Sequence, residues 1–547
     1  MRQLRTVLRQ YKAEYGRYPL TLDELEQSNF PAGQYLYRYP GKCGDFDLAC
    51  CPDDAAAEMI NDCRYHVRIN GRETELFRVN VSAAPINHVW PGFQRSFGQT
   101  ADAWFCRFEL TASTEIEVDI LYEDEPEWEI RPSHRVNTVK KTGKTISFKM
   151  DEPGQIAVLS GGLQEALHLF ADPPFVYELQ KNDIFFGPGV HHAGAIMPRS
   201  GQTVCIAEGA YVYGAIVVHH AENVRIIGRG VLDSSRIKCA REAVAGESGG
   251  EVMAAAASLG LDFDRWYVNG NIVIFGSSKV TVEGIILVDA PGWSLIVRNH
   301  SRNILIDNIK IIGQWRYNSD GIDICSSQHV IVKNSFIRSF DDCFVVRGPY
   351  LEGEYEDVRD VVVENCVLWC DWGKSLEVWS GERECTISDI RFHNIDMIHV
   401  QAVAISVDYW FGSGRSMVKD ICYDSLRVCS ESFYPNALCQ TEDCPDYPQG
   451  QGGYLPQLIR ISHGFLGKNL GNQQCVEAED TSYIHLSCRN VIFRNISIQG
   501  QRLPVQLKSD PGILEISDIR MEQVEYLELS SGPIKNLIVN ENAKENR

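Results

Sequence analysis

Four acidic residues in one short stretch have the types and spacing needed for acid–base chemistry. The stretch reads NSDGIDICSSQHVIVKNSFIRSFDDC from Asn318 to Cys343, and its acids are Asp320, Asp323, Asp341 and Asp342. Clustered carboxyl groups raise the pKa of at least one member, so one can stay a protonated acid while another stays an ionised base. Val and Ile alternate with polar residues between the acids, which predicts buried strands.

The elements that position these acids belong to an internal repeat. Its units begin with an Asn, Asp, Lys or His, continue with alternating apolar residues, and carry Asn, Asp or Gly at a fixed offset. They begin at Asn223, Lys279, Asn303, His329, Asp360, Asp389, Asp420, Asn490 and Asp518. From residue 279 onward the starts lie 24 to 31 residues apart, except for one gap of 70.

Short strands at this spacing predict the coils of a parallel β-solenoid, in which stacking buries the apolar face that a single coil leaves open. We expect an all-β chain whose main domain is a right-handed parallel β-helix. A leucine-rich repeat is disfavoured because its Leu-dominated consensus is missing. The recurring asparagines are predicted to stack as a ladder at one turn: Asn308, Asn334, Asn365, Asn394 and Asn495.

Two further regions are predicted before the solenoid. Residues 64–170 show period-two alternation between turn clusters, which is typical of an antiparallel β-sandwich. Residues 1–63 are expected to form a short helical segment containing cysteines. The solenoid domain then spans 171–547, with insertions at about 240–270 and 429–488.

The expected strand register predicts where the acids lie in the solenoid. The segments DGIDI, DCFVV, KSLEV and VAISV would be equivalent strands of successive coils. Their inward residues would be Ile322 and Ile324, Phe344 and Val346, Leu376 and Val378, and Ile405 and Val407. Asp320 and Asp342 would then begin neighbouring strands about 4.8 Å apart, with Asp341 beside them. Isolated solvated turn acids are the alternative, but a buried Asp–Asp pair facing a third Asp costs stability unless it is used.

Charge argues against two classes of partner. The 52 Lys and Arg against 73 Asp and Glu give a formal charge of −21, which repels nucleic acid and anionic membrane surfaces. No run of about 18 apolar residues predicts a membrane span. The first residues also lack the apolar segment of a signal peptide, so the chain as written is expected in the cytoplasm, and secreted if an export segment precedes it.

The cysteines do not favour a metal site. Eighteen are present, but paired spacings typical of zinc ligands are missing, and we expect neither metal nor cofactor. Two groups could be joined by disulfides in an oxidising compartment. They are Cys43, Cys50, Cys51 and Cys63, and Cys429, Cys439, Cys444, Cys475 and Cys488.

The combination of NSDG at Asn318 and DDC at Asp341 resembles the paired signature of family 28 polygalacturonases and their clan relatives, the family 49 dextranases and isopullulanases. The segments NVRIIGRGVLD and VCIAEGAYVYGAI also resemble that clan, so the likeness covers roughly residues 180–530. A sandwich before the solenoid is similar to the dextranase branch. The resemblance implies a glycoside hydrolase whose partner is a carbohydrate.

The resemblance also implies roles for the acids. Asp341 would protonate the glycosidic oxygen, while Asp320 and Asp342 would hold and activate water, which is inverting hydrolysis. Asn318 would fix the loop. Asp323 would be either a wall of the site or a structural hydrogen-bonding group.

Departures from the family pattern bear on the substrate. Lys374 replaces a family histidine, and Ala404 with Ser406, or Ser406 with Asp408, replaces the arginine and lysine that grip a galacturonate carboxylate. With Glu377 and Asp408 acidic, a neutral α-glucan-like sugar is favoured. Lys374 could bind a hydroxyl or tune the acids. Aromatic residues expected on this flank could stack on sugar, and the two taken as substrate-binding are Trp315 and Trp379; the others are Trp293, Tyr317, Trp372, Tyr409 and Trp410.

Three alternatives stay open at the level of sequence. A polygalacturonase could bind uronate through Lys374, Arg347 and Arg383 at new positions. An eliminase could use the same solenoid. A non-catalytic solenoid could bind carbohydrate without turnover, because fold alone does not choose the function.

Overall fold

The computed structural model describes residues 64–540 apart from 83–99, 122–126, 161–165, 238–269, 317, 350–353, 355, 382, 410–413, 431–456 and 464–483. It also describes the backbone of an antiparallel pair nearer the N-terminus, β1 (Tyr35–Arg38) and β2 (Asp47–Cys50). The helix predicted within 1–63 otherwise lies outside the described residues. The described residues include no helix long and apolar enough to cross a membrane.

Two five-stranded sheets form the β-sandwich predicted before the solenoid. In sheet order the first is β4 (Arg72–Glu73), β3 (Tyr65–Ile69), β7 (Thr114–Ile120), β10 (Thr145–Met150) and β9 (Asn137–Thr142). The second is β5 (Phe77–Ser82), β6 (Thr100–Glu109), β12 (Leu167–Asp172), β11 (Gly154–Ser160) and β8 (Trp128–Arg131). A short 3-10 helix, η4 (Ser133–Arg135), follows β8. Alternate residues such as Ile116 and Val118 of β7 are buried and belong to one core cluster with Ile156 and Val158 of β11.

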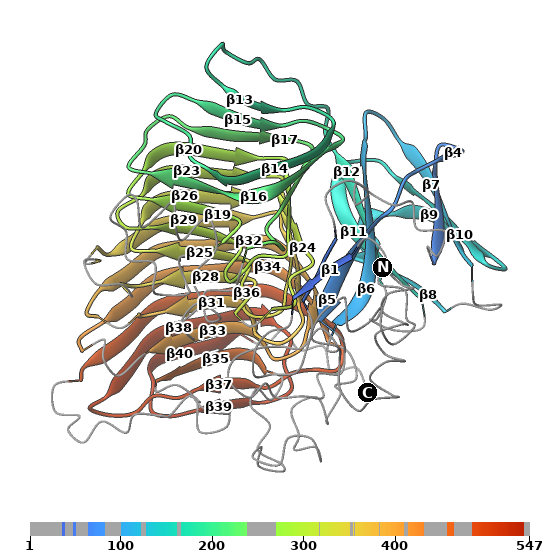
Figure 1. Cartoon of the computed structure of the whole chain (residues 1–547). Helices are drawn as coiled ribbons and strands as arrows, with labels where there is room; N and C mark the ends of the chain where they lie inside the picture. The colour runs from blue at the N-terminus through green and yellow to red at the C-terminus, as the bar shows by residue number, and fades with distance from the viewer. Residues whose placement is uncertain are drawn as a thin grey trace, which may run out of the picture.

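The remaining 28 strands form a right-handed parallel β-helix (Figure 1). Its first strands are β13 (Ile184–Phe186), β14 (Gly189–Ile196), β15 (Thr203–Ile206), β16 (Ala210–His219), β17 (Arg225–Gly228), β18 (Val231–Asp233), β19 (Ile272–Phe275), β20 (Ser278–Glu283) and β21 (Ile286–Val288). Next come β22 (Leu295–Arg298), β23 (Arg302–Asp307), β24 (Lys310–Ile312), β25 (Ile322–Cys325), β26 (Gln328–Lys333), β27 (Phe336–Ser339), β28 (Phe344–Arg347), β29 (Val358–Glu364), β30 (Val367–Cys370) and β31 (Lys374–Trp379). The last are β32 (Thr386–Val400), β33 (Val403–Tyr409), β34 (Met417–Ser430), β35 (Gln457–His463), β36 (Leu486–Gly500), β37 (Val505–Leu507), β38 (Leu514–Val524), β39 (Leu529–Ser531) and β40 (Lys535–Asn540).

The middle coils contain three strands each. Strands β22, β25, β28 and β31 pair in parallel one above the other, as equivalent strands of successive coils do. From β32 onward one long strand covers two of the three positions, because β32 pairs with both β29 and β30. β35 lies within the span predicted as an insertion, yet it pairs with β33 and β37 and completes a coil.

Every repeat start found in the sequence adopts left-handed backbone geometry. The nine residues from Asn223 to Asp518 have φ between 54° and 57°. Asn and Asp tolerate this conformation better than other non-glycine residues, which explains their prevalence at these starts. The sequence repeat therefore marks one sharp turn in each of these coils.

The predicted asparagine ladder is confirmed over three coils. Asn394 donates through Nδ2 to Asn365 Oδ1 at 2.7 Å, and Asn365 donates to Asn334 Oδ1 at 3.4 Å. The ladder ends on carboxylates, because Asn334 donates to Asp307 Oδ1. The other two members depart from the ladder: Asn308 donates to Asp172 and Asn495 to Asp424.

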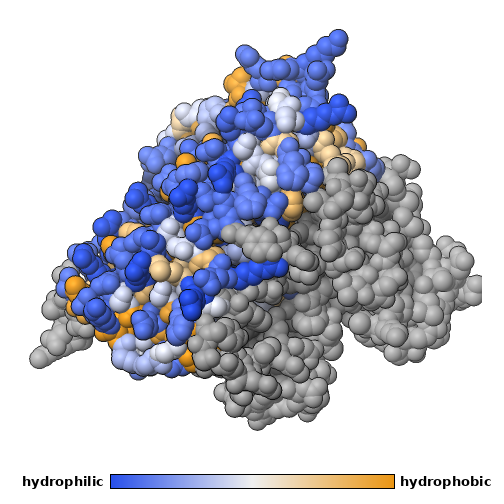
Figure 2. Space-filling view, turned by 90° about the vertical axis from the view of Figure 1, so that its left-hand side faces the viewer, coloured by the Kyte–Doolittle hydropathy of each residue, from blue (hydrophilic) through white to orange (hydrophobic). Residues whose placement is uncertain are grey.

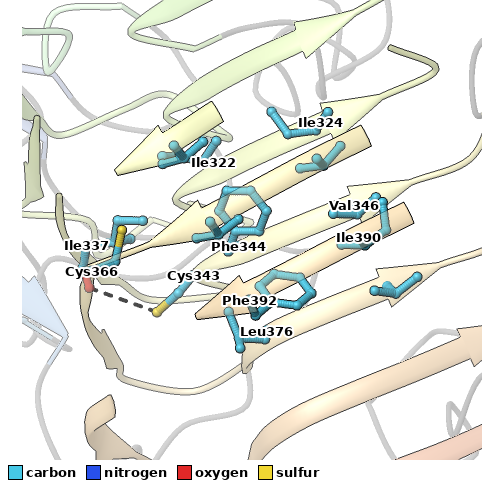
Figure 3. Packing of buried hydrophobic residues seen from close by; sticks show 14 of the residues in the cluster. Ile322, Ile324, Ile337, Cys343, Phe344, Val346, Cys366, Leu376, Ile390 and Phe392 are labelled. Carbon is cyan, nitrogen blue, oxygen red and sulfur yellow. Dashed lines mark hydrogen bonds between the residues drawn. The ribbon is translucent and has the colours of Figure 1, made fainter. Parts of the chain in front are cut away.

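The interior of the β-helix follows the predicted register. All eight residues expected to point inward belong to its core cluster. Figure 3 shows Ile322, Ile324, Phe344, Val346 and Leu376 on stacked strands of one sheet, in the same cluster as Ile390 and Phe392 of another strand. This alternation leaves the intervening residues, such as Asp323 and Glu377, on the outer face of the same strands. The face in Figure 2 is mostly hydrophilic with scattered apolar side chains, as on an ordinary protein surface.

The sandwich packs against one side of the β-helix through an apolar interface with a buried ionic cluster. Phe105 and Phe170 of the sandwich pack with Phe336 and Trp369 of the β-helix. Asp172, at the end of β12, is fully buried and accepts hydrogen bonds from Arg107 Nε at 2.7 Å and from Lys310 Nζ. The two regions therefore share an apolar cluster at their interface, besides the core inside each, while the residue boundaries predicted between them stay a prediction.

The disulfide hypothesis is tested only at two positions. Cys429 and Cys488 are both free thiols. The other members of the two cysteine groups lie outside the residues whose side chains the structure describes.

Candidate active site

The three aspartates predicted to act together begin two adjacent coils. Asp320 immediately precedes Gly321 and β25, while Asp341 and Asp342 lead into β28. The backbone amide of Gly321 donates to the carbonyl of Asp342 at 2.8 Å, which ties the two turns together. Ser294, one coil earlier, donates to the Asp320 carbonyl from its amide and its hydroxyl, both at 2.8 Å.

Asp341 is held through its main chain and through Asn318. Ser339 Oγ donates to the Asp341 carbonyl at 2.7 Å, and Cys370 Sγ contacts the same oxygen at 3.4 Å. The side chain is 7% exposed and accepts a hydrogen bond from Asn318 Nδ2 at 3.4 Å. Burial and the adjacent Asp342 raise the pKa of Asp341 well above its usual range. Asp341 is therefore more readily protonated than an ordinary aspartate.

Asp342 differs from Asp341 because hydrogen-bond donors contact its carboxylate. Lys374 donates to Oδ1 from its backbone amide at 2.7 Å and to Oδ2 from Nζ at 3.2 Å. Burial disfavours the charged form, but Lys374 and Glu377 outweigh burial, so the pKa of Asp342 is lowered. The surroundings thus shift the pKa values of these two adjacent residues in opposite directions.

Asp320 and Asp323 share Arg347. Arg347 Nη2 lies 3.0 Å from Asp323 Oδ1 and 3.6 Å from Asp320 Oδ2. Burial raises the pKa of Asp323 to about 7, and burial together with Asp323 and Asp341 raises the pKa of Asp320 well above its usual value. One oxygen of each, Asp320 Oδ1 and Asp323 Oδ2, has no hydrogen-bond partner among the described residues.

Lys374 and Glu377 both lie beside the acids, as predicted. Lys374 Nζ is 3.0 Å from Glu377 Oε1, so this lysine bridges Glu377 and Asp342. Burial, then the negative Asp342, raise the pKa of Glu377 well above its usual value. Of the two roles considered for Lys374, the contacts favour tuning the acids.

Asp408 lies one coil further on and is paired with a residue that sequence reasoning missed. The structure places Ala404 in the core and leaves Ser406 and Asp408 as the polar pair. Arg460 of β35, 2% exposed, binds Asp408 and lies 3.3 Å from Ser406 Oγ. Burial opposes ionisation, but Arg460 and Lys374 hold the pKa of Asp408 below its usual value. The alternation in QLIRISH could have revealed Arg460, since Ile459 and Ile461 on either side are core residues.

Several of the aromatic residues predicted to stack on sugar are buried or pack against other side chains. Trp293 and Tyr409 are at most 1% exposed, and Tyr409 belongs to the core. Arg347 lies 4.3 Å from the ring centre of Trp293 and 4.6 Å from that of Trp379, so Trp379 helps to hold the guanidinium. Trp315 is 7% exposed and lies beside Arg316. Trp372 stacks on Phe340, while Tyr317 and Trp410 lie outside the described residues.

A glycine lets the turn close on the acids. A Cβ added at Gly373 would lie 2.5 Å from Asp342 Oδ1 and 2.6 Å from Asp341 Oδ1. Both carboxyl groups therefore flank the backbone of this single residue, and any side chain there would displace them. Among the described residues, no group of three or more His, Cys, Asp or Glu side chains is arranged to hold a metal ion.

Known proteins with related sequences are carbohydrate-cleaving enzymes. Residues 267–352, which include Asp320, Asp341 and Asp342, match the sequence model of glycosyl hydrolases family 28. A dextranase from Arthrobacter sp. (strain CB-8) is 22% identical over 320 residues, which are 56% of this chain and 41% of the dextranase. An exopolygalacturonase from Arabidopsis thaliana is 29% identical over 176 residues, which are 27% of this chain and 42% of that protein.

The chain thus spans less than half the length of these two relatives. Among solved structures, Dex49A from Penicillium minioluteum superposes with a TM-score of 0.52 at 13% identity, covering 84% of this chain and 88% of Dex49A. That likeness shows the fold. The protein is therefore similar in sequence to dextranases and family 28 polygalacturonases, and it has the fold of a known β-helical protein, Dex49A.

Proposed function

We propose that the protein is an inverting glycoside hydrolase that cleaves O-glycosidic bonds of a poly- or oligosaccharide. The observation that carries this proposal is the contrast between two adjacent buried carboxyl groups. Asp342 accepts hydrogen bonds from the amide and Nζ of Lys374, whereas the Asp341 side chain accepts one from Asn318 at 3.4 Å and has a raised pKa. A proton donor and a base are the two groups that glycoside hydrolysis needs.

In the proposed reaction Asp341 donates its proton to the glycosidic oxygen as the bond to the anomeric carbon breaks. Asp342 takes a proton from a water molecule that attacks the opposite face of the sugar, which inverts the configuration. Asp320 orients this water through its unpartnered Oδ1. Asn318 holds Asp341 through the hydrogen bond to Oδ2.

A neutral glycan of the dextran or α-glucan type is the proposed substrate. Six carboxyl groups gather here: Asp320, Asp323, Asp341, Asp342, Glu377 and Asp408. The three described basic side chains that contact them, Arg347, Lys374 and Arg460, each already contact at least one of these carboxyl groups. To bind a uronate, one of these three cations would have to give up its present partner, which disfavours a uronate substrate.

Polygalacturonase activity is the second candidate, supported by the match of residues 267–352 to family 28. In that case Lys374 or Arg347 would exchange its present carboxylate partner for the substrate. Arg383, the third residue considered for this role, lies in the turn between β31 and β32, where its carbonyl accepts a hydrogen bond from Ser416.

The test is hydrolysis of dextran, pullulan and polygalacturonate by the full chain, with the anomer released followed by NMR. We expect cleavage of a neutral polymer with inversion. Retention would contradict the mechanism, and cleavage of polygalacturonate alone would select the second candidate. Unsaturated products would identify an eliminase, while binding without turnover would identify a non-catalytic carbohydrate-binding protein.

A further inference from the structure

Glu377 and Asp342 both contact the same lysine, and all three side chains are buried. Lys374 Nζ lies 3.2 Å from Asp342 Oδ2 and 3.0 Å from Glu377 Oε1. All three side chains are at most 5% exposed. Two ionised carboxylates and one ammonium group would leave an excess negative charge buried, which is costly.

Lys374 Nζ brings the two carboxyl groups together, because Asp342 Oδ2 and Glu377 Oε1 lie 3.2 and 3.0 Å from it. A hydrogen bond between the two side chains contributes to the lowered pKa of Asp342 and the raised pKa of Glu377. An ionised carboxylate has only acceptor atoms, so a hydrogen bond between two carboxyl groups requires a proton on one of them.

The surroundings decide which of the two keeps the proton. Asp342 accepts a hydrogen bond from the backbone amide of Lys374, a fixed donor that stabilises its ionised form. Glu377 faces a negative neighbour on the next coil, Asp408, as well as Asp342. Basic groups near the pair are Lys374 itself, Arg347 one coil before, and Arg460, which Asp408 engages. The proton therefore belongs to Glu377, in agreement with its raised pKa and the lowered pKa of Asp342.

We propose that Glu377 is a positioning residue that stays protonated and donates a hydrogen bond to Asp342, holding Asp342 as the ionised base. This inference rests on the hydrolase function proposed above and extends it to a residue that does not touch the reacting atoms. It also explains how one lysine can serve two carboxyl groups, because one of them is neutral.

The experiment compares wild-type protein with Glu377→Gln and Glu377→Leu. A glutamine amide still donates to Asp342, so the acidic limb of the pH profile of kcat/KM should not move and kcat should stay within about threefold. Leucine cannot donate, so the pKa of Asp342 should rise and the acidic limb should move up by roughly one pH unit. Glu364→Gln, in β29 on another face, is the matched control and should change neither quantity.

A second readout does not need turnover. Infrared difference spectroscopy detects the C=O stretch of a protonated carboxylic acid at neutral pH, and Glu377→Gln should remove one such band while Glu364→Gln leaves it. If Glu377 were ionised, Glu377→Gln would remove a negative charge, move the acidic limb down, and leave the band intact; either result overturns the proposal. Loss of the band in a protein that hydrolyses no glycan would instead contradict the proposed function while leaving the proton on Glu377.

Discussion

Lys374 binds Asp342 twice, from its backbone amide to Oδ1 at 2.7 Å and from Nζ to Oδ2 at 3.2 Å. The first bond needs only the main chain, whereas the second depends on the lysine side chain. A substitution of Lys374 therefore removes the charged hydrogen bond to Asp342 while keeping the one from the backbone amide.

We predict that Lys374→Met raises the pKa of Asp342, because Lys374 is the strongest influence that opposes burial there. The base would then need a higher pH to ionise, so the acidic limb of kcat/KM should move to higher pH. Activity lost at mildly acidic pH should return as the pH rises. Lys333→Met is the control, since Lys333 pairs with Asp307 at 3.4 Å on the outer face of β26. An unmoved limb in Lys374→Met would show that the lysine does not set the base.

Asp341→Asn should keep the shape of the side chain and its contact with Asn318 but remove the transferable proton. Turnover should fall by roughly 10²- to 10⁴-fold or more while the protein stays folded and binds glycan. An aryl glycoside with a good leaving group needs less protonation, so it should partly rescue Asp341→Asn. It should not rescue Asp320→Asn or Asp342→Asn, and the three losses should not add, because the groups titrate together. Near wild-type turnover in a folded Asp341→Asn protein would remove this assignment.

The coils, and the positions of the acids within them, could be predicted from the sequence, because both depend on local periodicity. The inward residues of β25, β28, β31 and β33 follow from period-two alternation, and the left-handed turn at each repeat start follows from Asn and Asp preferences. Stacking of adjacent coils then brings Asp320 beside Asp342. This could be predicted without knowing how the side chains pack.

Electrostatic partners were less accessible from sequence, because they come from strands far apart in the chain. Arg460 reaches Asp408 from 52 residues away, across a span that the repeat did not cover. Asn308 was expected to extend the asparagine ladder, but it binds Asp172 of the sandwich, 136 residues earlier. Trp379 was expected to offer its ring to sugar, yet it lies against Arg347. The first two differences reflect contacts between elements whose relative position local periodicity does not specify. Trp379 is different, because it is the register partner of Arg347 on the adjacent coil.

Gly373→Ala should disable the site and shift the turn that carries the acids, because the added methyl carbon would also lie 2.7 Å from the Asp341 carbonyl carbon. The added methyl carbon would lie within 2.6 Å of the Oδ1 atoms of Asp341 and Asp342, so both acids must move. A displacement of about 1 Å can lower turnover by roughly 10²-fold. The control is Gly187→Ala, whose Cβ meets only the Phe185 ring at 3.4 Å. Steady-state kinetics and thermal unfolding of both variants test this prediction. An unchanged kcat in Gly373→Ala would contradict the close approach of residue 373 to the two carboxyl groups.

Asp172→Asn should destabilise the protein most near neutral pH. Burial disfavours the Asp172 charge, but Lys310, Arg107 and Arg229 outweigh burial and lower its pKa. Its contribution to stability is therefore present above the unfolded value of about 3.9 and is lost as the pH falls through the lower folded value. Removing this buried partner should cost about 3–5 kcal/mol.

The urea midpoint of unfolding, measured at pH 7 and at pH 3, checks this sign. The gap between wild type and Asp172→Asn should be large at pH 7 and smaller at pH 3. Asp360→Asn, at an ion pair with a 57% exposed carboxylate, should change stability by no more than about 0.5 kcal/mol. A gap that widens on acidification would mean that Asp172 is protonated in the folded protein.

Two buried tyrosines in the β-helix core should respond oppositely to removal of the hydroxyl group. Tyr423 stacks between Phe392 and Phe493 at ring distances of 4.9 and 5.1 Å, and its Oη has no hydrogen-bond partner among the described residues. Tyr409 Oη donates to the carbonyl of Ser487 at 2.7 Å. Because an unsatisfied buried hydroxyl costs about 1–3 kcal/mol, Tyr423→Phe should leave the protein equally stable or more stable. Tyr409→Phe should cost about 1 kcal/mol, since it removes the hydrogen bond to the Ser487 carbonyl. Thermal unfolding of the two variants side by side measures the contrast, and equal losses would show that Tyr423 has a partner in solution.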